Sequence, residues 1–77
     1  MNDTRRKGLR EVSEMLNEAI EALEVFLEEE QNYIENVPEN LQGSEKYELA
    51  ELAVDELEEA IDNIKEAVDN IDSASGG

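Results

Sequence analysis

Residues 45–72 read EKYELAELAVDELEEAIDNIKEAVDNID, and they carry an unbroken helical pattern. Apolar side chains recur there in alternating steps of three and four, at Tyr47, Ala50, Val54, Leu57, Ile61, Ile64, Val68 and Ile71. This spacing gathers them on one stripe of an α-helix. A flanking row of small residues lets another helix approach closely: Ala53, Ala60, Ala67 and Ala74. The pattern therefore predicts a helix over 45–72 that packs tightly against a neighbour.

The first half of the chain carries a similar stripe between Leu9 and Val37, which predicts a helix over 9–36. Its members are Leu9, Val12, Leu16, Ala19, Leu23, Phe26, Glu30, Tyr33 and Val37. A second row of Ile20, Leu27 and Ile34 widens the stripe to about three positions in seven, a width typical of a bundle helix with several neighbours. Glu30 is the only charged member. We expect it either to lie at the edge of the stripe or to reach Lys46 or Lys65 on a facing helix. The alternative is that it fixes the register of the packing.

The residues between the two stripes predict a tight turn over 37–44. Pro38 lacks an N–H and disfavours helical geometry in the residue before it, which ends the first helix near Asn36. Ser44 is a favourable N-cap for the second helix. Two helices of about 28 residues, each about 42 Å long, lie antiparallel when a short turn joins them. The predicted fold class is all-α, an antiparallel helical hairpin with a basic arm over 1–8 and a flexible tail over 73–77.

One hairpin cannot cover stripes of this width, so we expect two copies to dimerise into a four-helix bundle with two-fold symmetry. The length supports this, because a core formed by 77 residues seldom stabilises a chain alone and no Cys is present to form disulfides. The predicted dimer core consists of Leu16, Leu23, Phe26, Leu27, Val54, Leu57, Ile61, Ile64 and Val68. The alternatives are a larger helical assembly and a hairpin docked on a different protein.

The composition argues against catalysis. The absence of His and Cys removes the usual near-neutral general base and the usual zinc ligands, and no Gly-rich phosphate loop is present. We predict a non-enzymatic protein with no catalytic residue, no cofactor and no dedicated metal site. The sequence has neither the pattern of a secretory signal nor that of a membrane span, and we expect a cytoplasmic protein.

The charge is strongly negative, because 22 acidic residues stand against 6 basic ones and give a net charge of -16. Four of the basic residues lie in the first ten positions, at Arg5, Arg6, Lys7 and Arg10. The hairpin should bring them near the acids at the end of the second helix, Asp62, Asp69 and Asp72. A basic arm that grips nucleic acid is the alternative.

Carboxylates repeat every seven residues on the outer face of both helices, at Glu14, Glu21, Glu28 and Glu35 and at Glu48, Asp55, Asp62 and Asp69. Such a rod resembles a nucleic-acid backbone electrostatically, attracts basic surfaces, and repels nucleic acid and anionic membranes. We expect these two rows to bind a basic nucleic-acid-binding protein. The alternative is that the charge only keeps a helical oligomer in solution.

Residues 37–68 read VPENLQGSEKYELAELAVDELEEAIDNIKEAV. They resemble short uncharacterised acidic proteins of Gram-positive bacteria and their phages or mobile elements, in which a Pro-Glu-Asn-Leu-Gln-x-Ser-Glu turn precedes an Ala-rich acidic helix. The resemblance implies an intracellular helical hairpin from a gene pool in which inhibitors of host defence nucleases are common, and it implies no catalytic residue.

Together with the acidic rows, this resemblance favours a nucleic-acid-mimicking inhibitor of the anti-restriction or anti-CRISPR type. The alternative is a structural or regulatory oligomerisation hairpin that binds a partner helix through its apolar stripe.

Overall fold

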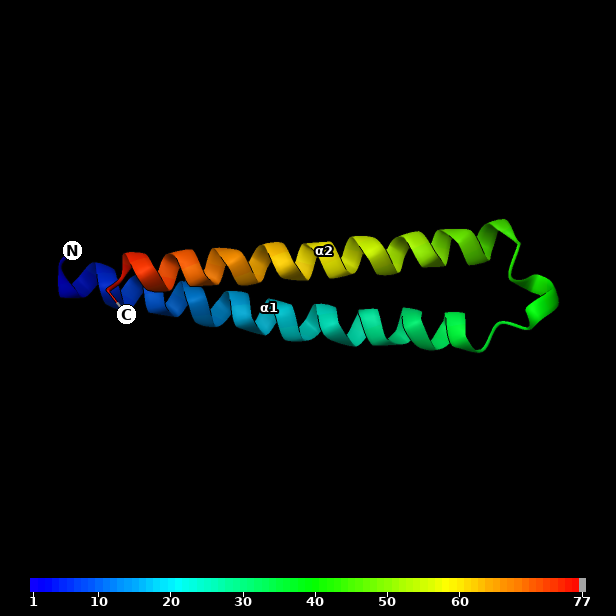
Figure 1. Cartoon of the computed structure of the whole chain (residues 1–77). Coiled ribbons are helices and arrows are strands. Elements are labelled where there is room, and N and C mark those ends of the chain that lie inside the picture. Colours follow the sequence, from blue (N-terminus) through cyan, green and yellow to red (C-terminus); the bar gives the residue numbers. More distant parts are fainter. Residues whose placement is uncertain (77) are drawn as a thin grey trace.

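The computed structural model describes residues 1–76, which form two long helices and a short connection. Helix α1 spans Asp3–Glu35, a single 3-10 turn η1 spans Glu39–Leu41, and helix α2 spans Glu45–Ala74. The helices run side by side in opposite directions, with both termini at one end of the rod (Figure 1). The rod measures 60 × 15 × 15 Å. The predicted antiparallel helical hairpin is confirmed.

The N-terminal residues differ from the prediction, because α1 begins at Asp3 rather than at Leu9. The side-chain oxygen of Asn2 accepts a hydrogen bond of 2.8 Å from the backbone N–H of Arg5 and caps the helix. Asp3 also favours the helix start, because its negative charge lies near the positive end of the helix dipole. The basic residues expected in an arm over 1–8 therefore lie on the first turns of α1.

The other end of the chain is also more helical than predicted. Helix α2 continues to Ala74, two residues into the segment 73–77 that we expected to be a flexible tail. Gly76 follows with a φ of 86°, a conformation that favours glycine. The last residue of the expected tail, Gly77, lies outside the described residues.

The connection between the helices forms as its residues predict. Helix α1 ends at Glu35, just before Asn36 and three residues before Pro38. The Ser44 hydroxyl accepts a hydrogen bond of 3.2 Å from the backbone N–H of Tyr47 and caps α2. Across the turn, the Lys46 ammonium lies 5.6 Å from the centre of the Tyr33 ring, a cation–π contact between the ends of the two helices.

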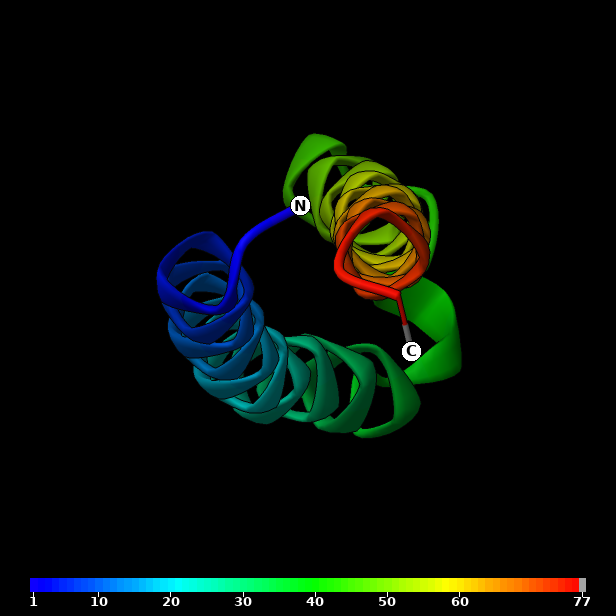
Figure 2. The same ribbon diagram turned by 90° about the vertical axis from the view of Figure 1, so that its left-hand side faces the viewer.

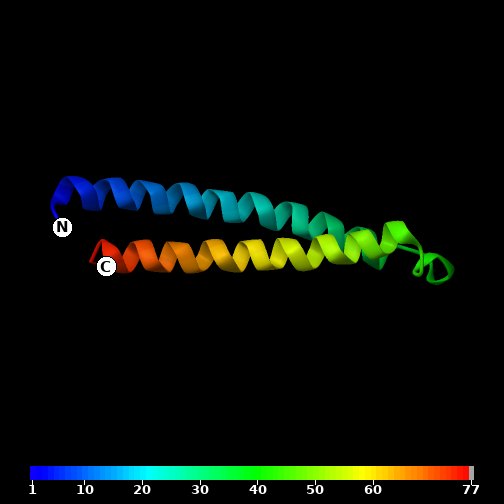
Figure 3. The same cartoon turned by 90° about the horizontal axis from the view of Figure 1, so that it is seen from above.

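The core lies along the seam between the helices. Ile20, Ile61 and Val68 are buried there, and partly buried apolar residues pack against them: Leu16, Leu23, Leu27 and Ile64. Views along the rod and from above show that the helices are inclined to one another, so the seam winds gradually along the hairpin (Figures 2 and 3).

The inward-facing stripe of α1 consists of two rows, and one of them is shifted by one residue from the predicted row. The row that faces α2 is Ser13, Ile20, Leu27 and Ile34, together with Leu9, Leu16, Leu23 and Glu30. The neighbouring row of Val12, Ala19, Phe26 and Tyr33 is exposed. Ile20 is 5% exposed and Phe26 is 57% exposed, so the row that we predicted as the flank is the central one.

Candidate functional site

One long face of the hairpin gathers acidic side chains from both helices. The Gln31 side chain donates a hydrogen bond of 3.4 Å to the Glu58 carboxylate, and the Ser13 hydroxyl donates one of 3.0 Å to Asp72. On the same side, a shallow cleft is lined by Glu24, Leu27, Glu58, Ile61, Asp62 and Lys65. Apart from Ser13, the polar residues in these contacts each come directly after an inward-facing residue of their helix. Residues at such positions on both helices therefore form one continuous surface.

All eight carboxylates of the two predicted rows are exposed and belong to this surface. Each directly follows an inward-facing residue: Glu14 follows Ser13 on α1, and Asp62 follows Ile61 on α2. In an antiparallel pair these positions lie on the same side of the seam. We call this surface the acidic face and define it by Glu14, Glu21, Glu28, Glu35, Glu48, Asp55, Asp62 and Asp69.

The acidic face is not neutralised by ion pairs within residues 1–76. In this part of the chain the one ion pair joins Arg6 to Asp3 at 3.5 Å, and it lies at the end of the rod. Lys46 lies over Tyr33 instead of beside a carboxylate of the face. Lys65 lines the cleft on this side with Glu24, Glu58 and Asp62, but in the described part of the chain it forms no ion pair with them. The carboxylates along the middle of the described hairpin therefore have no ion-pair partner.

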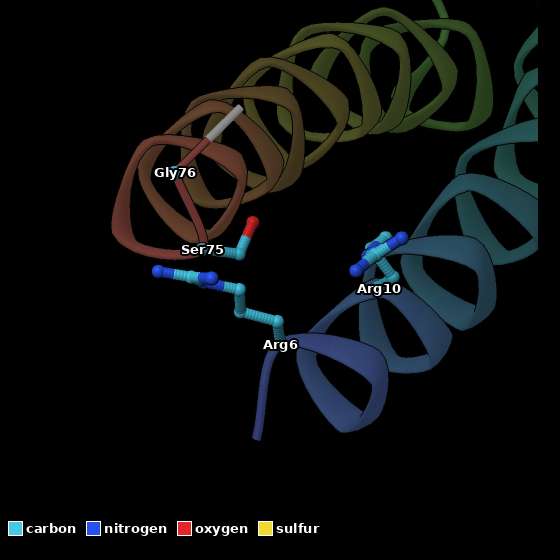
Figure 4. A pocket seen from close by; sticks show the side chains of 4 residues that line it. All are labelled: Arg6, Arg10, Ser75 and Gly76. Atoms are coloured by element: carbon cyan, nitrogen blue, oxygen red, sulfur yellow. The ribbon is translucent and has the colours of Figure 1, made fainter. Parts of the chain in front are cut away.

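The basic residues lie at the open end of the hairpin, as expected. Arg6 and Arg10 line a cleft with Ser75 and Gly76, and the Arg6 side chain extends from α1 toward the end of α2 (Figure 4). The expected acids are not paired with them in the described residues, because Asp72 accepts its hydrogen bond from Ser13 and Arg6 pairs with Asp3. Arg6 and Arg10 therefore lie beside the end of α2 and form no ion pair with Asp62, Asp69 or Asp72 in the described residues.

The opposite long face is apolar. On α1 it carries the exposed row Val12, Ala19, Phe26 and Tyr33 with Met15 and Ala22, and on α2 it carries Ala53, Ala60, Ala67 and Ala74 with Leu49. A cleft lined by Glu30, Tyr33, Lys46, Leu49 and Ala50 joins the two helices on this side. We call this surface the apolar face.

The residues predicted for a dimer core divide between two places. All except Phe26 are buried or half-buried along the seam of the hairpin, where they pack within one chain. Phe26 lies on the apolar face. Glu30 is half-buried near the turn and lines the same cleft as Lys46, consistent with the expectation that it lies within reach of that lysine.

Ser13 is the polar core residue that the predicted stripe missed. It is 6% exposed, and its hydroxyl donates to Asp72 on the other helix. The signal for it was present, because Ser13 lies seven residues before Ile20 and so begins the row that continues through Leu27 and Ile34.

Comparison of the chain with known protein families, with curated proteins and with solved structures found no match. No helix within residues 1–76 is long and apolar enough to cross a membrane. The same residues contain no group of three or more acidic side chains arranged to hold a metal ion.

Proposed function

We propose that this chain is a non-enzymatic acidic interaction module whose acidic face engages a basic protein surface. The observation that carries the proposal is the convergence of both carboxylate rows on one exposed face without neutralising ion pairs in the described residues. A surface whose charges all have the same sign steers an oppositely charged partner into contact and raises the rate of association.

The partner that best fits the acidic face is a nucleic-acid-binding protein, such as a host defence nuclease. Within each row the carboxylates are seven residues apart, about 10 Å along the helix axis, which is sparser than the phosphates of one nucleic-acid strand. The likeness to nucleic acid therefore lies in an extended line of negative charge, which attracts a basic groove built for phosphates. The resemblance of residues 37–68 to acidic proteins of phages and mobile elements supports the same proposal.

The dimeric four-helix bundle predicted from the sequence belongs to this proposal. A lone hairpin leaves Met15, Phe26 and Leu49 more than half exposed to water, at 64%, 57% and 58%. A dimer would shelter such side chains and would carry the acidic face twice. The proposed site of action is the cytoplasm, consistent with a chain that lacks Cys.

The acidic face can be tested with two variants of equal charge. The first carries Glu21→Gln, Glu28→Gln, Asp55→Asn and Asp62→Asn, which neutralise the middle of the face. The control carries Glu11→Gln, Glu18→Gln, Glu59→Gln and Glu66→Gln, which remove the same charge from exposed positions outside the face.

Tagged parent protein should capture basic nucleic-acid enzymes from its host extract. This capture should fade between about 50 and 200 mM salt and should be displaced by added duplex DNA. The variant in the acidic face should lose capture and the control should keep it. Equal capture by both variants would contradict the proposal.

The second candidate function is an oligomerisation hairpin that binds a partner helix. The specific observation in its favour is the apolar face, whose bulky side chains have no cover within the hairpin. In this case capture would be indifferent to salt, and the variant neutralised in the acidic face would bind as the parent does.

A further inference from the structure

Helix α1 carries two apolar stripes, and only one of them packs on α2. The inward-facing row is buried or half-buried along the seam. The other stripe consists of Val12, Met15, Ala19, Ala22 and Phe26, which follow one another in steps of three and four and are all exposed. A helix with two such stripes requires two neighbours, and the hairpin supplies one.

We propose that a second copy of this chain covers the apolar face. This inference rests on the dimeric module proposed above, and adds to it the surface through which the copies meet. It also differs from the predicted dimer core, whose other members pack within one chain while Phe26 alone is left for the second copy.

The shape of the apolar face fits a second copy. Its bulky members, Val12, Met15 and Phe26, come from α1, whereas α2 contributes the small side chains of Ala53, Ala60, Ala67 and Ala74. A two-fold rotation lays the bulky ridge of each copy over the alanine row of the other, and facing layers of large and small residues interdigitate. The face thus contains both the projections and the spaces that receive them.

The size of the face also fits a stable dimer. It extends over 49–74 on α2, about 38 Å at 1.5 Å per residue, on a rod that is 15 Å wide. The projected area is about 600 Å² per copy, and side-chain relief brings the accessible surface buried by two copies to roughly 1,200–1,600 Å², within the standard range for specific interfaces.

The distribution of charge permits this contact despite a net charge of -16 on each chain. Glu29 and Glu56 interrupt the apolar face at the heptad positions that Met15 and Leu49 also occupy, and both are exposed. This position lies farther from the seam than the rows of Phe26 and Ala60, so the two carboxylates lie along the rim of the face beside water. Glu30 is half-buried in the cleft near the turn. The acidic face points away from the contact, so the dimer keeps its two acidic faces on opposite sides and free for the proposed partner.

Two neighbouring substitutions test the interface. Phe26 and Val25 are 57% and 55% exposed, but Phe26 lies on the apolar face and Val25 on the outer side of α1. The parent should sediment with twice the mass of one chain. Phe26→Gln should weaken dimerisation by at least about tenfold, and Val25→Gln should leave it unchanged. A parent that stays monomeric up to about 100 μM, or equal effects of the two variants, would overturn the inference.

A second measurement covers the case in which Phe26→Gln loses helicity. The chain has no Cys, so Ala22→Cys places a single thiol on the apolar face and Glu21→Cys places one on the acidic face. Modification of the first thiol by a maleimide should slow as the protein concentration rises, because a second copy covers it. Modification of the second should not depend on concentration. Concentration-independent rates at both positions would refute a second copy on this face.

Measurements at several salt concentrations distinguish a failure of this inference from a failure of the proposed function. Screening weakens the repulsion between two acidic chains, so dimerisation should strengthen as salt is added. Capture of a basic partner should weaken over the same range. The variant neutralised in the acidic face should still dimerise but should not capture a basic partner. A parent that is monomeric and still captures basic proteins would contradict the proposed interface and leave the proposed function standing.

Discussion

Glu30 is the residue whose position conflicts most with its chemistry. It belongs to the inward-facing stripe of α1, where its neighbours along the stripe are Leu23, Leu27 and Ile34, and it is half-buried. Its carboxylate shares a cleft with Lys46, but the Lys46 ammonium lies over the Tyr33 ring. The hairpin thus accommodates a charged group at a position where an apolar side chain would pack.

We expect Glu30→Leu to raise the free energy of unfolding by about 1–2 kcal/mol, because a buried leucine adds apolar area to the seam. Urea denaturation at a fixed protein concentration measures it. Glu28→Leu is the matched control: residue 28 is exposed on the acidic face, and its change should stay within about 0.5 kcal/mol. A less stable Glu30→Leu protein, or one with a different mass, would instead indicate that Glu30 sets the register.

At the scale of the helix, the start of α1 can be tested at Gly8. A Cβ added there meets nothing within 4 Å, and the residue lies in the second turn of α1. Gly8→Ala should stabilise the helix by about 0.5–1 kcal/mol and increase the helical circular dichroism signal.

Gly43 provides the control for this substitution. It also has open space around it, but it lies in the turn, so Gly43→Ala should leave the helical signal unchanged. If Gly8→Ala and Gly43→Ala give the same signal as the parent, residues 3–8 are not helical in solution and the basic segment is an arm after all.

The end of α1 should respond to a change of charge. Its last turn contains Glu35 and no basic residue, although a positive charge is favoured where the helix dipole is negative. Glu35→Lys should raise stability by about 0.3–1 kcal/mol more than Glu21→Lys, which makes the same change in net charge in the middle of the same row. Thermal melts of the two variants compare them directly, and equal melting temperatures would show that only net charge matters.

The two helices and their turn could be predicted because local signals define them. Apolar periodicity marks both helices, Pro38 marks the end of the first, and Ser44 marks the start of the second. The start of α1 could not be predicted in the same way, because no apolar stripe extends before Leu9 and the helix there depends on the Asn2 cap. A short helical segment that depends on a cap produces little apolar periodicity in the sequence.

The inward face of α1 could not be chosen from periodicity, because two adjacent rows are both apolar. The row that begins at Val12 fitted an inward-facing row better than the row that begins at Ser13, because Ser13 is polar. Packing decides between them, since Ser13 finds an acceptor on Asp72 and the larger Ile20 and Leu27 fill the seam. On α2 the competing row is all alanine, and no ambiguity arose.

The acidic residues were each predicted, but their common face was not. The side of the seam on which a row lies depends on which row of the same helix faces inward, and on α1 the predicted inward row was off by one position. With Ser13 and Ile20 facing inward, the antiparallel pairing places both acidic rows on one side of the seam and the exposed apolar residues on the other. The contact between Gln31 and Glu58 joins the two helices on the acidic side.

At the scale of the whole molecule, the hairpin must fold against its own charge. A net charge of -16 is spread along a narrow rod, and the one ion pair within residues 1–76 joins Arg6 to Asp3. Carboxylates in successive turns repel one another over distances near the screening length, which is about 10 Å at 0.1 M salt. The unfolded chain separates these charges, so the repulsion destabilises the folded state.

The melting temperature should therefore rise with salt, by on the order of 5 °C between about 20 and 200 mM sodium chloride, which corresponds to about 1 kcal/mol for a domain of this size. The variant neutralised at Glu21, Glu28, Asp55 and Asp62 should melt higher at low salt and respond less to added salt. Sodium sulfate at equal ionic strength controls for ion-specific effects on apolar burial. A parent whose melting temperature does not change with salt would mean that the acids are compensated locally, and the acidic face would then have little free charge to offer a partner.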